Sequence, residues 1–119
     1  MPDNNYYQRI SAIQSAIALT RTYHIDRCIN SAHRFCMVVD ERKESGNRDA
    51  FREIHAETDY DPCLDEIFDL ITGLHGCNQF LSALYFVKGD RLQSELWQQK
   101  HLLLVNRVFN RPTELNDGE

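Results

Sequence analysis

Apolar residues recur every three or four positions along most of the chain, which is the spacing that predicts α-helices. The first stripe follows Asp3, Asn4 and Asn5, any of which can cap a helix; it contains Tyr6, Ile10, Ile13 and Ile17 and is widened by Ala12, Ala16 and Leu19. A second stripe contains Ile25, Cys28, Ile29, Ala32, Cys36 and Val39. The pattern is blurred over residues 20–24, so one bent helix and two separate helices both remain open.

Capping residues divide the middle of the chain. Gly46 is expected to close the second stripe, because glycine adopts a left-handed backbone at little cost. Asn47 could cap a short helix that carries Phe51 and Ile54. Asp61 is a suitable N-cap for a further helix, and Pro62 fits its first position, where the missing amide costs nothing.

The second half of the chain continues the helical pattern. After Pro62 one helix face holds Leu64, Ile67, Phe68, Ile71 and Leu74, and Gly73 and Gly76 weaken or break that helix. The next segment is apolar on nearly all sides through Phe80, Leu81, Leu84, Tyr85 and Val87, and Gly89-Asp90 closes it and caps the last helix. That helix contains Leu92, Leu96, Trp97, Leu103, Leu104, Val108 and Phe109 and ends before Pro112.

These segments predict an all-α fold. No alternation of period two has useful length, so we expect residues 1–119 to form a single-domain bundle of about five helices, with 113–119 as a disordered tail. The last helix is apolar on two sides, which a small bundle cannot easily bury. We therefore expect a homodimer, a twofold homo-oligomer whose interface contains Trp97, Leu102, Val105 and Phe109.

Composition and charge exclude several classes of protein. The 119 residues are 42% hydrophobic and 26% charged, which is ordinary for a globular domain and unlike disordered or collagen-like chains. The net charge of −5 argues against nucleic acid as a partner. The charge is uneven, because residues 40–70 hold eleven acidic and four basic side chains, a net charge of −7. Such a segment is typical of a solvated face, or it binds a cation or a basic partner.

The predicted location is the cytoplasm. Apolar runs are too short for a membrane span, and the first residues lack the basic start and apolar core of a signal peptide. In that compartment Cys28, Cys36, Cys63 and Cys77 stay reduced, and their apolar neighbours indicate small buried side chains.

Two pairs of carboxylates at helical spacing form the sharpest candidate site. Glu41 and Glu44 are three residues apart, as are Glu66 and Asp69, so each pair shares a helix face. If the two helices lie side by side, four carboxylates can meet across a groove. Oxygen ligands of this kind suit Mg²⁺, which keeps waters for a substrate phosphate.

The two pairs resemble the motif of the MazG-like all-α nucleoside triphosphate pyrophosphohydrolases over residues 36–72. That family has Glu-x-x-Glu, a gap, and then Glu-x-x-Asp followed by aliphatic residues, as in Glu66-Ile67-Phe68-Asp69-Leu70-Ile71 here. The resemblance implies that Glu41, Glu44, Glu66 and Asp69 bind Mg²⁺ and that water attacks the triphosphate to release pyrophosphate. It also implies phosphate contacts from basic or polar residues of the last helix, among them Lys100, Asn106, Arg107 and Arg111.

Other candidate sites match known patterns less well. His33 and Cys36, His24 and Cys28, and His75 and Cys77 are close pairs, but none has the spacing of a zinc finger or ribbon. Arg27 and His33 have the broad spacing seen in some helical ribonucleases of the HEPN group. Asp49, Glu53 and Glu57, interleaved with Arg48 and Arg52, are expected to form a salt-bridged exposed face.

Two functions therefore follow from the sequence. The first is a small cytoplasmic helical protein that self-associates and binds a protein or small-molecule partner, with no cofactor. The alternative is a Mg²⁺-dependent pyrophosphohydrolase that uses the four carboxylates. Convergence of those four side chains on one point distinguishes the two.

Overall fold

The computed structural model describes residues 4–42, 46–72 and 76–109, and all regular structure in this part is helical. The elements are α1 (Asn4–Leu19), α2 (Ile25–Glu41), α3 (Gly46–His55), α4 (Cys63–Thr72), α5 (Cys77–Lys88) and α6 (Arg91–Phe109). The all-α prediction is confirmed for the described residues, with six helices rather than about five. The tail at 113–119 lies outside them.

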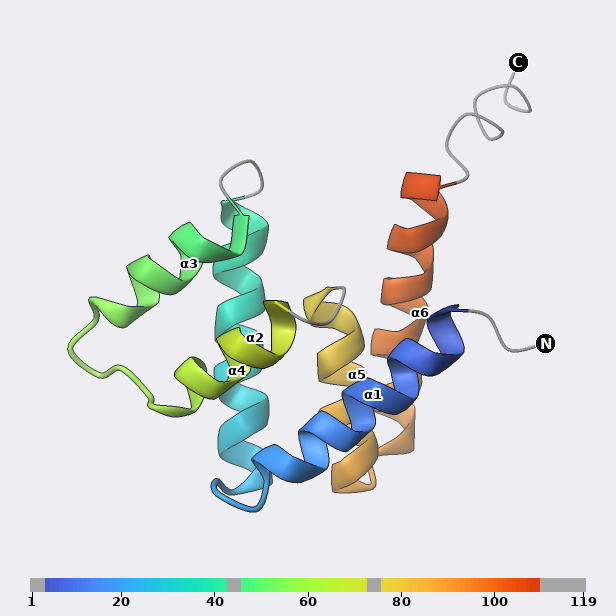
Figure 1. Ribbon diagram of the computed structural model, residues 1–119, viewed down its shortest axis with the longest axis horizontal. Coiled ribbons are helices and arrows are strands. Elements are labelled where there is room, and N and C mark those ends of the chain that lie inside the picture. Colours follow the sequence, from blue (N-terminus) through green and yellow to red (C-terminus); the bar gives the residue numbers. More distant parts are fainter. Residues whose placement is uncertain (1–3, 43–45, 73–75, 110–119) are drawn as a thin grey trace.

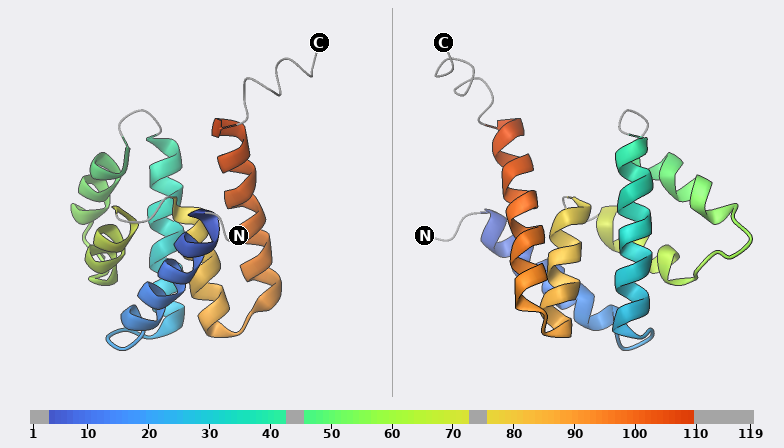
Figure 2. Two further views of the ribbon diagram at one scale, coloured as in Figure 1. Left: turned by 45° about the vertical axis from the view of Figure 1, so that its right-hand side comes forward. Right: turned by 180° about the vertical axis from the view of Figure 1, so that it is seen from behind.

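Helices α2 and α5 lie at the centre of the molecule. Helices α3 and α4 pack on α2, whereas α1 and α6 pack on α5 (Figures 1 and 2). The contact between α2 and α5 joins these two groups of three helices. As a result, α3 and α6 occupy opposite edges of the molecule (Figure 1).

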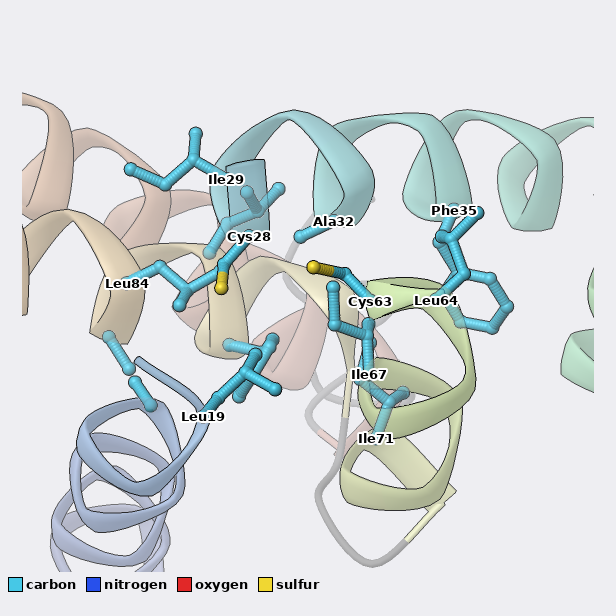
Figure 3. Packing of buried hydrophobic residues seen from close by; sticks show 14 of the residues in the cluster. Leu19, Cys28, Ile29, Ala32, Phe35, Cys63, Leu64, Ile67, Ile71 and Leu84 are labelled. Carbon is cyan, nitrogen blue, oxygen red and sulfur yellow. The ribbon is translucent and has the colours of Figure 1, made fainter. Parts of the chain in front are cut away.

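The hydrophobic core fills the space between α1, α2, α4 and α5. Figure 3 shows residues from all four helices meeting there, among them Leu19, Ala32, Ile67 and Leu84. The apolar stripes predicted for α2 and α4 supply six of the eighteen buried hydrophobic side chains among the described residues, since Cys28, Ile29, Ala32, Leu64, Ile67 and Ile71 are all at most 4% exposed. Burying such faces is the main stabilising contribution in a bundle of this size.

The helix boundaries confirm some predicted caps and contradict others. The chain leaves helical geometry at Thr20 and re-enters it at Ile25, so α1 and α2 are separate, and the His24 side chain accepts from the backbone N–H of Asp26. Gly46 as a C-cap is wrong, because α2 closes at Arg42, whose N–H bonds to the carbonyls of Val38 and Val39. Gly46 instead begins α3, so Asn47 lies inside that helix and does not precede it.

Glycine and aspartate define the other boundaries as expected. Gly76 has a φ of 92° just before α5, which confirms the predicted break there. Gly89 ends α5 with a φ of 96°, a backbone conformation that is costly for other residues. Asp90 then caps α6, because its Oδ1 accepts from the N–H of Gln93 at 3.2 Å.

Helix α1 is turned differently from what its isoleucine stripe indicates. Ala12 and Ala16 are fully buried, whereas Ile10 and Ile17 are 41% and 43% exposed. The small alanines let α1 approach α5 closely, and these two larger side chains of the stripe are left outside. The predicted stripe is present, and Ala12, Ala16 and Leu19 face the core with Ile13 packed against it, but Ile10 and Ile17 lie outside.

Helix α6 shows the same inversion more strongly. Ser94 and His101 are buried, at 2% and 1% exposure, and they lie on one side of the helix. Leu92, Leu96 and Leu103 lie on the opposite side at 67%, 45% and 64% exposure. Helix α6 therefore packs on α5 through a polar face and leaves its leucines outside.

None of the helices within the described ranges is long and apolar enough to span a bilayer.

Candidate functional site

A pocket of about 150 Å³ lies between the middle of α2 and the segment that joins α3 to α4. Its walls are mostly polar, and they consist of Asn30, Ser31 and Arg34 from α2, Glu57, Asp59, Tyr60 and Asp61 from the connecting segment, and Leu64 from α4. Because helix positions 30, 31 and 34 share one face, α2 presents a continuous polar wall to the connecting segment.

Asp61 is the most highly connected side chain of the pocket. Its Oδ1 accepts from the backbone N–H of Cys63 at 2.9 Å, which confirms the predicted cap at the start of α4. The same carboxylate accepts from the Arg27 Nε, at 3.1 Å to each oxygen, and from the Ser31 hydroxyl at 2.9 Å. One aspartate thus both starts α4 and attaches it to α2.

These contacts determine the direction in which the pKa of Asp61 is shifted. Partial burial alone would raise it, but the hydrogen bonds from the Cys63 amide, Arg27 and Ser31 outweigh burial, and the pKa lies below its usual value. The hydrogen bond to Asp61 in turn raises the pKa of Arg27. Both side chains are therefore ionised at neutral pH.

Two further ion pairs hold α3 and its C-terminal segment against α2. The Arg34 Nε donates to Glu57 Oε1 at 2.9 Å, and its Nη2 donates to Oε2. The Arg42 Nε and Nη2 donate to the two Glu53 oxygens at 2.9 and 3.0 Å. The acidic line of α3 is salt-bridged as predicted, but Glu53 and Glu57 pair with arginines of α2; within α3, Arg52 pairs with Asp49.

The four cysteines are arranged as two thiol pairs that involve α2. Cys28 of α2 contacts Cys63 of α4, and both are fully buried (Figure 3). Cys36 of α2 contacts Cys77 of α5, and both are half-buried. All four thiols are free. Burial and neighbouring acidic groups raise the pKa of Cys63 to about 12, so these thiols serve as core packing.

Three of the four carboxylates expected to bind Mg²⁺ lie on the outer surface. Glu41, at the end of α2, and Glu66 and Asp69, on α4, are exposed. Glu44 lies outside the described residues. Among the residues that the structure does describe, no three His, Cys, Asp or Glu side chains are grouped so that they could hold one metal ion. The convergence of all four carboxylates stays a prediction.

The expected interface and phosphate-binding residues occupy different environments. Trp97 is half-buried, with its ring 5.1 Å from that of His33, and the Lys100 Nζ lies 4.0 Å above the Trp97 ring. Leu102 is 36% exposed. The side chains of Val105, Asn106, Arg107 and Phe109 and all of Arg111 fall outside the described part of the chain.

Arg27 and His33, weighed from the sequence as a pair, have different partners, and His75 lies outside the described residues. His33 Nε2 lies 2.8 Å from the Tyr85 hydroxyl, whereas Arg27 points to Asp61, so the Arg27–His33 spacing does not correspond to a shared site. Sequence reasoning missed the pocket itself. Its signal was the pair of arginines seven residues apart on α2, which lie opposite the acidic segment 57–61.

Comparison with known proteins found no matching family model, no matching curated protein and no matching solved structure. The interpretation of the site therefore depends on its own geometry.

Proposed function

We propose that this protein is a small helical binding protein that self-associates through α6. The observation that supports this function is the inverted packing of α6, which buries Ser94 and His101 while Leu92 and Leu103 remain about two-thirds exposed. Removing large apolar side chains from water lowers the free energy, so a helix that directs them outward is suited to contact with another apolar surface.

The spacing of the exposed leucines favours a second helix as the contact. Leu96 follows Leu92 by four residues, and Leu103 follows Leu96 by seven, so the three lie on one line along α6. Steps of four and seven are those of the apolar seam between two packed helices. A second copy offers the same line of leucines, and a twofold axis would bring the two together.

Exposed apolar side chains are concentrated on the same half of the molecule. Of the eleven large hydrophobic residues that are exposed in the described part of the chain, nine belong to α1 and α6: Tyr6, Tyr7, Ile10, Ile17, Leu92, Leu96, Leu102, Leu103 and Leu104. The acidic pocket lies between α2 and the segment that joins α3 to α4. That segment and α6 lie at opposite edges of the molecule (Figure 1). Self-association and ligand binding would thus use separate surfaces.

Sedimentation velocity over a concentration series tests self-association. The wild-type protein is expected to reach twice the chain mass of 13.9 kDa. Leu103→Glu should remain monomeric, because a charge on the seam must be desolvated. Met37→Glu is the matched control, since Met37 is 55% exposed and belongs to α2, not to the line of leucines on α6. A wild-type protein that is monomeric at all concentrations, or an equal loss of dimer in Met37→Glu, would contradict the proposal.

The alternative proposal is the Mg²⁺-dependent pyrophosphohydrolase. It is supported by the packing of α2 beside α4, which carry Glu41 and the Glu66–Asp69 pair on exposed positions. Thermal melting with Mg²⁺ or Mn²⁺ and a nucleoside triphosphate tests it. Occupation at 100 times the dissociation constant stabilises by about 2.7 kcal/mol. A metal-dependent rise in Tm that Glu66→Ala removes would favour the enzyme, and its absence would favour the binding protein.

A further inference from the structure

We propose that the pocket between α2 and the segment 57–61 binds a small organic cation, a primary ammonium or guanidinium group on a short apolar stem. The volume of about 150 Å³ sets the size of the ligand. A cavity of roughly that volume accommodates a benzene ring, so a molecule of about six heavy atoms is of the right size.

The charges of the pocket lining favour a cation. Three carboxylates, Glu57, Asp59 and Asp61, face one guanidinium, that of Arg34. Glu57 is bonded to Arg34, and Asp61 is bonded to Arg27 outside the lining. Asp59 interacts electrostatically with Arg34 but makes no hydrogen bond or ion pair with another described residue, so its carboxylate oxygens are available to a ligand. An anion would be repelled by this carboxylate and by the net charge of −7 on residues 40–70.

The remaining lining determines what kind of cation fits. The three carboxylates are not grouped as ligands of one metal ion, since no such cluster exists within the described ranges. Tyr60 and Leu64 add an aromatic ring and an apolar side chain to the wall, which suits an alkyl stem, and an aromatic face also attracts cations. Asn30 contributes an amide oxygen that can accept from an N–H donor.

The pocket is held open by the same ion pairs that attach the segment to α2. Arg34 with Glu57 and Arg27 with Asp61 fix its two ends, 57 and 61, while Asp59 and Tyr60 between them are bonded to neither arginine. A cation therefore binds without breaking either pair. Binding of such a cation would define the ligand class of the proposed binding protein and so rests on that function. The pocket is lined by α2, segment 57–61 and Leu64, whereas the proposed seam belongs to α6, so a loss of cation binding and a loss of self-association can be told apart.

Titration of the protein with n-butylammonium, followed by backbone amide NMR shifts, tests the pocket. Shifts are expected at Asn30, Asp59 and Tyr60, and a higher salt concentration should weaken binding because the pocket is partly open. Butyrate, which has the same chain length and the opposite charge, should leave these signals unchanged. Saturable shifts with butyrate, or none with n-butylammonium at tens of millimolar, would overturn the proposal.

Asp59→Asn supplies the decisive variant, because this exposed side chain contributes no bond to the fold. The dissociation constant for n-butylammonium should rise at least fivefold in Asp59→Asn. Asp40→Asn is the matched control, since Asp40 is an exposed carboxylate on α2 outside the pocket lining. Equal affinity in Asp59→Asn and the wild type would refute the site, whatever the oligomeric state in sedimentation.

Discussion

Ser82 and Ser94 each donate a hydrogen bond to the backbone carbonyl of the other across the contact of α5 with α6. The two distances are 2.7 Å from the Ser82 hydroxyl and 2.9 Å from the Ser94 hydroxyl. The Arg9 Nη1 of α1 donates to the Ser82 hydroxyl at 2.8 Å and to Gln98 Oε1 at 2.6 Å. Polar side chains thus link three helices, and the polar face of α6 that they occupy lies opposite its leucines.

The serine pair predicts strong coupling between the two positions. Ser82→Ala or Ser94→Ala should lower the free energy of unfolding by about 0.5–1.5 kcal/mol, because each change removes a buried hydrogen bond, although the accepting carbonyl keeps the backbone N–H of its own helix. Urea unfolding of both single variants and the double variant measures the coupling. Strictly additive losses would show that the two bonds do not form a unit.

Acid should weaken the attachment of α4 to α2. The folded-state pKa of Asp61 lies below its unfolded value of about 3.9, so its contribution is present above that pH and is lost as pH falls through the folded pKa. Asp61→Asn keeps a capping side chain but removes the charge. This change should lower the free energy of unfolding by about 1 kcal/mol at pH 7, a modest value because Arg27 is half exposed. It should also make the free energy of unfolding fall less steeply with pH below about pH 4. Asp40→Asn, which changes an exposed carboxylate, should leave that profile unchanged.

The environment of His33 indicates a second pH dependence of the free energy of unfolding, closer to neutral pH. Burial, with a further contribution from the charge of Lys100, lowers the pKa of His33. The unfolded chain therefore binds this proton more readily, and the stability is lost as pH falls from about 6.5 through the folded pKa. NMR titration of the His33 ring should give a midpoint below 6.5. In His33→Gln the free energy of unfolding should depend less on pH between 7.5 and 5 than in the wild type. A midpoint at or above 6.5 would contradict this prediction.

The buried thiols should react slowly in the native protein. The pKa of Cys63 is raised to about 12 from an ordinary 9.0, so at a given pH this thiol carries roughly a thousandth of the usual thiolate. The pKa of Cys28 is also raised, mainly by burial. Modification at pH 8, followed by mass spectrometry of peptides, should label Cys28 and Cys63 only as fast as the protein unfolds. In denaturant both should react at once, which controls for reagent quality. Rapid native labelling of Cys63 would show that the contact of α2 with α4 opens.

The local features of the fold could be predicted from the sequence. Helical spacing indicated an all-α chain because it depends on residues three and four apart. The caps at Asp61 and Asp90 and the breaks at Gly76 and Gly89 follow from backbone geometry within a few residues, and they were predicted correctly. The C-cap prediction for Gly46 was wrong because the end of one helix and the start of the next lie close together there. A capping pattern alone does not indicate to which of the two helices the glycine belongs.

Only the tertiary structure decided which faces are buried and which charges pair. Helix α6 offered two apolar sides and α1 a single stripe with alanines at its edge. Close packing on α5 selected the small and polar side chains, so Ile10 and Leu103 remain outside. Arg27 and Asp61 are 34 residues apart, and Arg34 and Glu57 are 23 apart, so no local pattern could pair them. Spacing along a chain determines which residues share a helix face, whereas a contact between helices depends on how those faces fit together in three dimensions.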